Sequence, residues 1–156
     1  MKTETSGPYL FDVGVIALAH TDAPVREPAL KYVQAGIAGE IEVVVPYPAV
    51  IGAHNVLTTY YGHSNATASR LLENFLDAKR IHWYDTISHD IVRGGFSQAS
   101  KTNIGGWDGY YAEVARSEGV NTVVTIDTDF ERFDAFDTEI ILSTDQFREL
   151  NRYLGS

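Results

Sequence analysis

Short runs of β-branched and aromatic residues alternate with helical patterns along this chain. Residues 121–126, Asn-Thr-Val-Val-Thr-Ile, form the strongest of these runs, and 41–45 is a second clear one. Shorter runs at 9–13, 81–84 and 139–142 complete the series. Such an alternation is typical of an α/β fold, because parallel strands need a crossover, usually a helix, between them. We therefore predict an α/β fold with a mainly parallel sheet.

Helical patterns occupy most of the intervals between the predicted strands. Asp22 is a candidate N-cap for a helix that ends near Gly39. The pair Gly94-Gly95 predicts a break in the helix at 85–100, because glycine is a poor helix former. Two further helical segments are expected at 15–20 and 49–61, and another begins at a cap formed by Ser64 or Asn65. A helix is also expected from Trp107 to Gly119. The C-terminal helix begins with the capping-box pair Ser143 and Gln146.

The length and composition suit one compact domain, 1–156, because 44% of the 156 residues are hydrophobic. A run of about 18 uncharged apolar residues, which a membrane span needs, does not occur. Residues 1–12 lack the basic flank and apolar segment of a signal peptide. The sequence contains no cysteine, which excludes disulfides and cysteine-based zinc sites. We expect a cytoplasmic protein without a membrane partner.

The net charge is -9, from 21 acidic residues against 12 basic ones, and only four of the basic residues are lysine. An acidic surface repels nucleic acids and membranes at low ionic strength. Acidity with few lysines is also what adaptation to a salty, halophilic archaeal cytoplasm would produce, where the Debye length falls to about 3 Å. The alternative interpretation is an ordinary acidic protein.

Aspartates follow two of the predicted strands and open the helix between them. Asp12 lies in the first strand, Asp127 and Asp129 come directly after the strongest strand, and Asp108 opens the helix before that strand. Right-handed crossovers bring the carboxyl ends of parallel strands to one edge, where ligands bind in open α/β sheets. If the first and strongest strands are neighbours, we expect Asp12 and Asp127 to lie about 5 Å apart.

Converging carboxylates favour a cation, because they repel one another unless a positive charge lies between them. Mg²⁺ prefers carboxylate oxygens and water as ligands. Two such ions about 4 Å apart can activate water and stabilise a leaving oxygen in phosphodiester cleavage. The placement of these four aspartates therefore indicates a metal-dependent reaction at the carboxyl edge of the sheet.

Each aspartate also has a purely structural interpretation. Asp108 could stabilise a helix N-terminus, and Asp127 could be a turn residue after a strand. Asp129 could face solvent, and the segment 128–131 has a capping-box pattern. Asp12 is the hardest to explain structurally, because a strand interior disfavours an unpaired carboxylate.

At three segments the sequence resembles the PIN domain, a small metal-dependent nuclease fold that includes VapC-type toxins. The segments are 10–15 (Leu-Phe-Asp-Val-Gly-Val), 107–115 (Trp-Asp-Gly-Tyr-Tyr-Ala-Glu-Val-Ala) and 125–130 (Thr-Ile-Asp-Thr-Asp-Phe). The resemblance covers nearly the whole chain. It implies a three-layer α/β/α sandwich around a mainly parallel sheet of about five strands.

The resemblance also implies an activity and a ligand set. Asp12, Asp108 and Asp127 match the family's metal-binding acids, and Asp129 matches a frequent additional one. The implied reaction is hydrolysis of RNA phosphodiester bonds by an endoribonuclease that uses Mg²⁺ or Mn²⁺. The family further implies a toxin role, in which an antitoxin protein covers the cleft, and homodimers are common.

One departure from the family pattern supports a different interpretation. The family usually carries a glutamate in the helix after the second strand, where this chain has Gly52 and Ala53, followed by His54 and Asn55. The alternative is a catalytically inactive PIN-like module that binds RNA or a protein partner. A phosphoacceptor domain of receiver type is disfavoured, because it needs a pair of acids at the end of the first strand and Asp12 stands alone there.

Weaker signals concern the substrate. Residues 95–102 approach the spacing of a phosphate-binding P-loop, but Ser100 replaces a glycine that the loop requires. We instead expect Lys101 and Thr102, with Arg93, to contact a substrate backbone at the rim of the site. Aromatic side chains that could stack on unpaired bases are Tyr60, Tyr61, Trp107, Tyr110 and Tyr111, of which Tyr110 and Tyr111 also fit a helix face directed to the core.

Overall fold

The computed structural model describes residues 7–155 and contains a five-stranded parallel sheet in the order β3-β2-β1-β4-β5. In register, Tyr9 of the central strand lies opposite Val43 on one side and Thr122 on the other. The predicted fold class is confirmed, and the first and strongest strands, β1 and β4, are neighbours. The strands are β1 (Tyr9–Phe11), β2 (Val43–Pro46), β3 (His82–Tyr84), β4 (Thr122–Thr125) and β5 (Asp137–Ile140).

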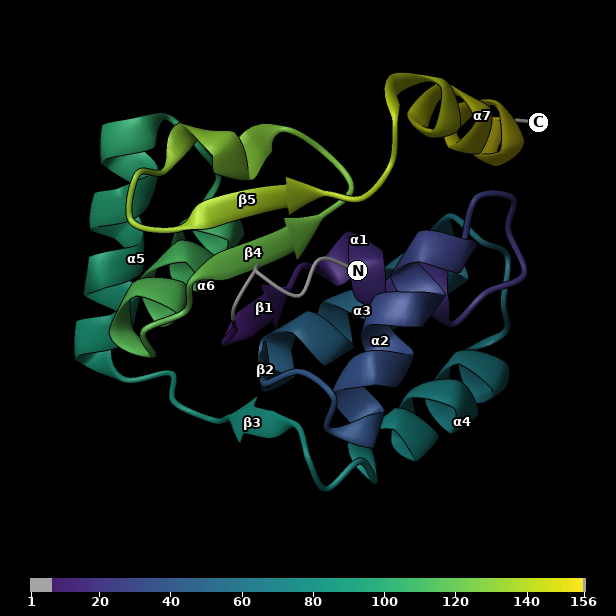
Figure 1. The fold of residues 1–156 in the computed structure, drawn as a ribbon, viewed down its shortest axis with the longest axis horizontal. Helices are drawn as coiled ribbons and strands as arrows, with labels where there is room; N and C mark the ends of the chain where they lie inside the picture. Colours follow the sequence, from purple (N-terminus) through teal and green to yellow (C-terminus); the bar gives the residue numbers. More distant parts are fainter. Residues whose placement is uncertain (1–6, 156) are drawn as a thin grey trace.

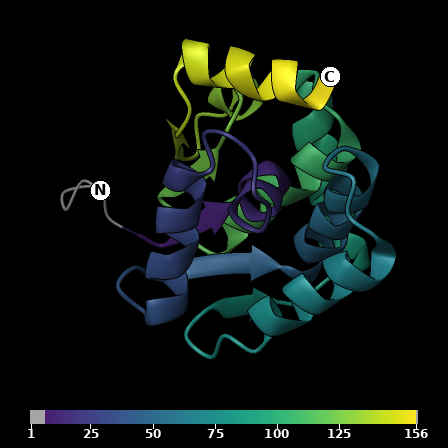
Figure 2. The same ribbon diagram turned by 90° about the vertical axis from the view of Figure 1, so that its right-hand side faces the viewer.

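Helices flank both sides of the sheet. The pair α5 and α6 lies on one side of the strands in Figure 1, and the group from α1 to α4 lies on the other. This division follows from right-handed crossovers, because the chain moves outward from β1 to β3 and then returns to β4. Figure 2 shows α7 crossing over one end of the molecule. The helices are α1 (Val13–Ala19), α2 (Glu27–Ala38), α3 (Tyr47–Thr59), α4 (Asn65–Leu76), α5 (His89–Thr102), α6 (Gly106–Ser117) and α7 (Thr144–Gly155), with a 3₁₀ turn η1 (Asp129–Arg132).

Several predicted helix ends are confirmed by their capping bonds. The Ser64 hydroxyl accepts a hydrogen bond from the Thr67 N–H at 3.1 Å at the start of α4. At the start of α7, Ser143 and Gln146 make both bonds of the capping box, at 2.9 and 3.1 Å. Gly119 adopts a left-handed φ of 66° just after α6, as a C′ glycine should. Within residues 7–155, the helices are too short or too polar to cross a membrane.

The structure corrects three predicted boundaries. Helix α2 begins at Glu27 and not at Asp22, since Val25 has a φ of 61° that a right-handed helix cannot contain. Strand β5 covers 137–140 and not 139–142, because these four residues pair with the four residues of β4. The first strand ends at Phe11, so that Asp12 caps α1 and does not lie within β1.

The predicted break at Gly94-Gly95 is wrong, because α5 runs through both glycines. They allow α6 to pack closely against α5. A Cβ atom on Gly95 would lie 2.9 Å from the Cα of Tyr110, and a Cβ atom on Gly109 would overlap the Gly95 carbonyl oxygen. The glycines therefore serve the contact between two helices, an interaction that propensity within a single helix does not represent.

Candidate active site

Asp12 lies where β1 turns into α1, at the carboxyl edge of the sheet. One carboxylate oxygen, Oδ1, accepts a hydrogen bond from the Val13 N–H at 2.8 Å, as an N-cap does. The other, Oδ2, accepts one from the hydroxyl of Thr125 at 3.0 Å. The side chain is buried, with 8% of Asp12 exposed. Its burial is thus accompanied by two hydrogen bonds, which explains how a carboxylate is tolerated here.

Asp127 lies two residues beyond the end of the neighbouring strand β4. Its Oδ1 accepts a hydrogen bond from the Asp129 N–H at 2.9 Å, which shapes the turn that leads into η1. The Asp127 N–H is directed to the Thr125 hydroxyl oxygen at 3.4 Å. Thr125 therefore contacts both aspartates. Sequence reasoning missed this residue, although a polar residue at the end of an apolar strand was a signal that could have revealed it.

The electrostatics indicate that the aspartates lie within reach of one another. Burial, together with the charges of Asp108 and Asp127, raises the pKa of Asp12 to about 7. Burial and the charges of Asp127 and Asp129 raise the pKa of Asp108 to about 6. Burial also raises the pKa of Asp127, and the charge of Asp129 adds to the rise. Each of the three carboxyl groups therefore lies in a field of negative charge.

The carboxylate oxygens of these aspartates are ligands of the kind that a hard divalent ion takes. Mg²⁺ takes oxygen ligands and keeps several waters, so one or two carboxylates are enough to hold it. Within the described part of the chain, no three acidic or histidine side chains are already gathered around a point that an ion could occupy. A bound ion would therefore be held by few protein oxygens and completed by water.

Helix α3 contributes no carboxylate, because its sequence Tyr-Pro-Ala-Val-Ile-Gly-Ala-His-Asn-Val-Leu-Thr-Thr lacks an acid. Val13 packs at Gly52, where a Cβ atom would lie 3.2 Å from the Val13 Cγ2 atom. His54 is directed to α4, with its Nε2 atom 3.0 Å from the Ser69 hydroxyl. Asn55 is exposed, and its side-chain oxygen accepts a hydrogen bond from Thr59. These contacts supply no substitute for the missing glutamate.

The residues expected to contact substrate lie in two separate places. Arg93 is exposed on α5, where its guanidinium lies 3.1 Å from His89 Nε2. Lys101 and Thr102 line a different cavity of about 360 Å³, together with Arg132. The Thr102 hydroxyl donates to the Gln98 carbonyl at 2.7 Å. Residues 95–102 are helical, so the P-loop-like spacing forms no phosphate-binding loop.

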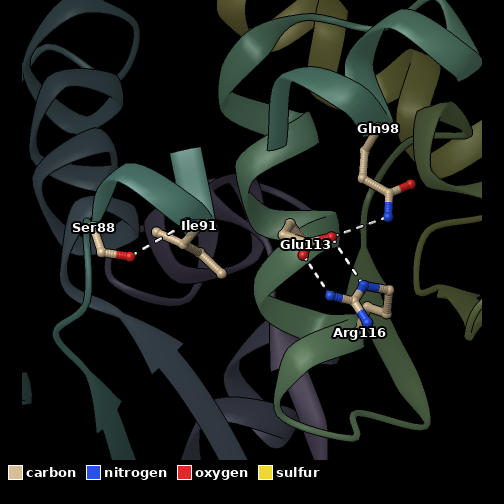
Figure 3. Close-up of polar contacts among 5 residues, drawn as sticks. All are labelled: Ser88, Ile91, Gln98, Glu113 and Arg116. Atoms are coloured by element: carbon tan, nitrogen blue, oxygen red, sulfur yellow. Dashed lines mark hydrogen bonds and ion pairs between the residues drawn. The ribbon is translucent and has the colours of Figure 1, made fainter. Parts of the chain in front are cut away.

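A further acidic side chain, Glu113, belongs to the contact between α5 and α6. Arg116 donates two hydrogen bonds to its carboxylate, at 2.6 and 3.0 Å, and Gln98 of α5 donates a third at 3.1 Å (Figure 3). These hydrogen bonds, chiefly that from Arg116, lower the pKa of Glu113. In the same view Ser88 caps α5 by accepting from the Ile91 N–H. Glu113 is thus a paired structural carboxylate, unlike the aspartates at the sheet edge.

Comparison with solved structures identifies the fold. The chain superposes on VapBC2 from Rickettsia felis bound to a DNA fragment from its promoter, with a TM-score of 0.63, 15% identity, and coverage of 84% of this chain and 96% of that one. It also superposes on a toxin-antitoxin complex from Klebsiella pneumoniae, with a TM-score of 0.59, 14% identity, and coverage of 83% and 95%. The chain has a PIN-like α/β/α fold.

A third similar structure is PAE2754 from Pyrobaculum aerophilum, with a TM-score of 0.59 and 20% identity over 96% of this chain and 94% of that one. The sequence matches no protein-family model and no curated protein. Because the identities to the three structures lie between 14% and 20%, the comparison concerns the PIN-like fold alone.

Proposed function

We propose that this protein is a divalent-metal-dependent endoribonuclease that hydrolyses RNA phosphodiester bonds. The observation that supports it is the field of negative charge at the carboxyl edge of the sheet. The charged groups that raise the pKa values of Asp12 and Asp108 are other carboxylates, and this field attracts a cation. In a PIN-like fold this edge is also the place where ligands of open α/β sheets bind.

In this proposal Asp12, Asp108 and Asp127 hold Mg²⁺ or Mn²⁺, and Asp129 assists them. Such an ion, when bound, supplies a lowered pKa for water and neutralises charge on the phosphate. Thr125 positions the Asp12 carboxylate through the bond at 3.0 Å. In the absence of a cation, the Asp12 carboxyl group holds a proton for part of the time near neutral pH, since its pKa is about 7.

Partners follow from the same proposal. Arg93, Lys101 and Thr102 contact the RNA backbone, from the two places that they occupy along α5. Two of the similar structures are described as VapBC2 and as a toxin-antitoxin complex. This chain is accordingly proposed to act as a toxin that an antitoxin protein covers, and to form a homodimer.

One observation favours a second candidate function. Helix α3 presents no carboxylate near Asp12, and Val13 packs against the bare backbone of Gly52. The alternative is therefore a catalytically inactive PIN-like module that binds RNA or a protein partner.

Cleavage of a panel of structured and single-stranded RNAs separates these two functions. We expect cleavage with Mg²⁺ or Mn²⁺ and none with EDTA, measured at low and high salt because of the charge of -9. Asp127→Asn should lower the rate by about 10²–10³-fold, the usual effect of removing one electrostatic group from a site of this kind. The neutralised carboxyl differs little in size, so the variant should remain folded.

Asp77→Asn is the matched control, because Asp77 is an exposed residue at the end of α4. It makes the same chemical change away from the sheet edge and should leave cleavage unaltered. Metal-dependent cutting by the wild type that is lost only in Asp127→Asn would support the nuclease. The absence of cutting in every condition, from folded protein, would favour the inactive module.

A further inference from the structure

Trp107 is a large aromatic side chain that the fold leaves in solvent. It is 64% exposed, although it lies on an amphipathic helix whose next aromatic residues, Tyr110 and Tyr111, are buried. Its ring is supported and not free: the centroid lies 6.1 Å from that of Tyr111 with the planes at 24°, and 6.0 Å from that of Tyr110 in an edge-on contact. The indole is therefore fixed in direction while much of its surface faces water.

Phe96 adds a second exposed ring beside it. The Phe96 side chain is 62% exposed on α5. Its Cε1 atom lies 3.6 Å from the place that a Cβ atom on Gly106 would take, so the ring packs over the residue that precedes Trp107. Phe96 also lines a shallow depression with Ile87, which is 59% exposed, and with Arg93. Contiguous exposed apolar surface is a feature of sites that bind ligands or partners.

The position of this surface indicates what it binds. Trp107 immediately precedes Asp108 in the first turn of α6, so it is adjacent in sequence to one of the acids proposed to hold the metal ion. In RNA, the base attached next to a reacting phosphate lies within a few bonds of it. Proteins that recognise single-stranded RNA place aromatic rings under such unpaired bases. The flat faces of two aromatic rings also fit a planar ligand, such as a base, better than they fit the side chains of a protein helix.

The charge of the chain limits how an RNA can bind here. The chain carries a net charge of -9, so long-range attraction of a polyanion is weak and contacts with the bases have to supply affinity. One cation, Arg93, lies in the depression with Phe96, whereas Lys101 lines a separate cavity together with Arg132 of η1. Arg132 is fixed there by donating to the Asn103 carbonyl at 2.8 Å. Arg93 is thus the cation of these three that shares the depression with Phe96, and phosphate contacts beside the rings are few.

We propose that Trp107, with Phe96 beside it, is a stacking site for an unpaired RNA base next to the phosphate at the acidic edge. The assignment rests on the proposed ribonuclease function, because it names the substrate of that site as single-stranded RNA. It further requires that base stacking, and not the number of phosphate contacts, accounts for most of the affinity.

Fluorescence of a single tryptophan tests the stacking directly. The protein is the full chain with Trp83→Phe, which leaves Trp107 as the one indole of the two in the sequence, and with Asp127→Asn to prevent cleavage. The probes, added with Mg²⁺, are a single-stranded RNA of twelve mixed nucleotides, the same strand without bases, and the same sequence as a duplex. We expect the single strand to quench the fluorescence and to bind at least about tenfold more tightly than the other two.

Substitutions locate the effect. Binding of the labelled single strand, measured by anisotropy, should weaken about tenfold in Trp107→Ala, the usual effect of losing one stacked base, and should be largely restored in Trp107→Phe. Tyr153→Ala is the matched control, because Tyr153 is an aromatic residue of α7 that is 41% exposed and has no assigned role in RNA binding. It should bind RNA as the parent does.

The outcomes separate the stacking site from the nuclease. Equal binding of the strand without bases, no binding of any probe, or unchanged binding in Trp107→Ala would overturn the stacking site, and a protein partner for Trp107 would then be the better explanation. Cleavage by the wild type would still stand in that case. Binding of the labelled single strand that Trp107→Ala weakens, in a protein whose wild type does not cleave, would keep the stacking site and reject the nuclease.

Discussion

Asp12→Asn is expected to abolish RNA cleavage and, at the same time, to stabilise the metal-free protein against unfolding at pH 8. The pKa of Asp12 is raised from 3.8 to about 7 by burial and by the charges of Asp108 and Asp127. Between these two values the folded state binds more protons than the unfolded state, so folding stability falls as the pH rises from about 4 to about 7. Above pH 7 the full penalty of the buried charge is present.

The size of the effect follows from the raised pKa. A rise from 3.8 to about 7 corresponds to about 4 kcal/mol, at 1.36 kcal/mol for each pH unit. Because the aspartates titrate together, we expect a gain of about 2–4 kcal/mol for the neutral asparagine at pH 8 and no gain below pH 4. Asparagine can still accept the hydrogen bond from the Val13 N–H, so the N-cap of α1 is retained.

Denaturant unfolding of the two proteins at pH 4, 6 and 8 measures this gain. Mg²⁺ should raise the midpoint of the wild type, since a ligand that binds only the folded state stabilises it, and should have little effect on Asp12→Asn. Asp77→Asn again controls for the loss of a charge. A variant that is less stable than the wild type at pH 8, or that responds to Mg²⁺ equally, would contradict the proposed role of Asp12.

Gly109→Ala is expected to destabilise the protein by about 2–3 kcal/mol. The new Cβ atom would overlap the Gly95 carbonyl oxygen and lie 2.9 Å from the Cβ atom of Ala99. Both obstacles are on α5, and one of them is backbone, so the two helices must move apart. Overpacking of this kind typically costs about 1–3 kcal/mol and occasionally more, and it outweighs the gain of up to about 1 kcal/mol from the better helix propensity of alanine.

Gly106→Ala is the matched control, because its Cβ atom meets only the Phe96 ring at an ordinary distance of 3.6 Å. It lies in the same helix and should be neutral or slightly stabilising in chemical denaturation. If Gly109→Ala were as stable as the wild type, α5 and α6 would not pack as closely as the structure has them.

The sequence predicts a candidate site from the positions of its acids, and it places several element boundaries wrongly. Asp12, Asp108 and Asp127 were selected because acids at strand ends and at a helix start converge on one edge of a parallel sheet, and the strand order places β1 beside β4 as that argument required. Arg93, Lys101 and Thr102 were selected together, but the structure divides them between two depressions along α5. Spacing along a helix does not by itself predict which side chains line the same depression.

The fold class was within reach of the sequence because it depends on local patterns. A β-branched run such as that of β4 and the capping box of α7 act over a few residues, and they can be recognised without knowledge of the rest of the chain. Right-handed crossovers leave few alternative strand orders for a chain of this kind. The predicted convergence of the acids at one edge of the sheet follows from that strand order.

Other features needed the tertiary structure because they depend on residues far apart in the chain. The Thr125 hydroxyl that holds Asp12 comes from a strand 113 residues further on, and the raised pKa of Asp12 arises from burial and from charges on other elements. The same reason explains Gly94-Gly95. Helix propensity alone predicts a break at these glycines, whereas in the structure they lie where α6 packs against α5. The sequence by itself determined which elements form and which acids lie at the ends of the strands and at the start of α6, whereas the packing of those elements decided how buried these acids are and which charges act on them.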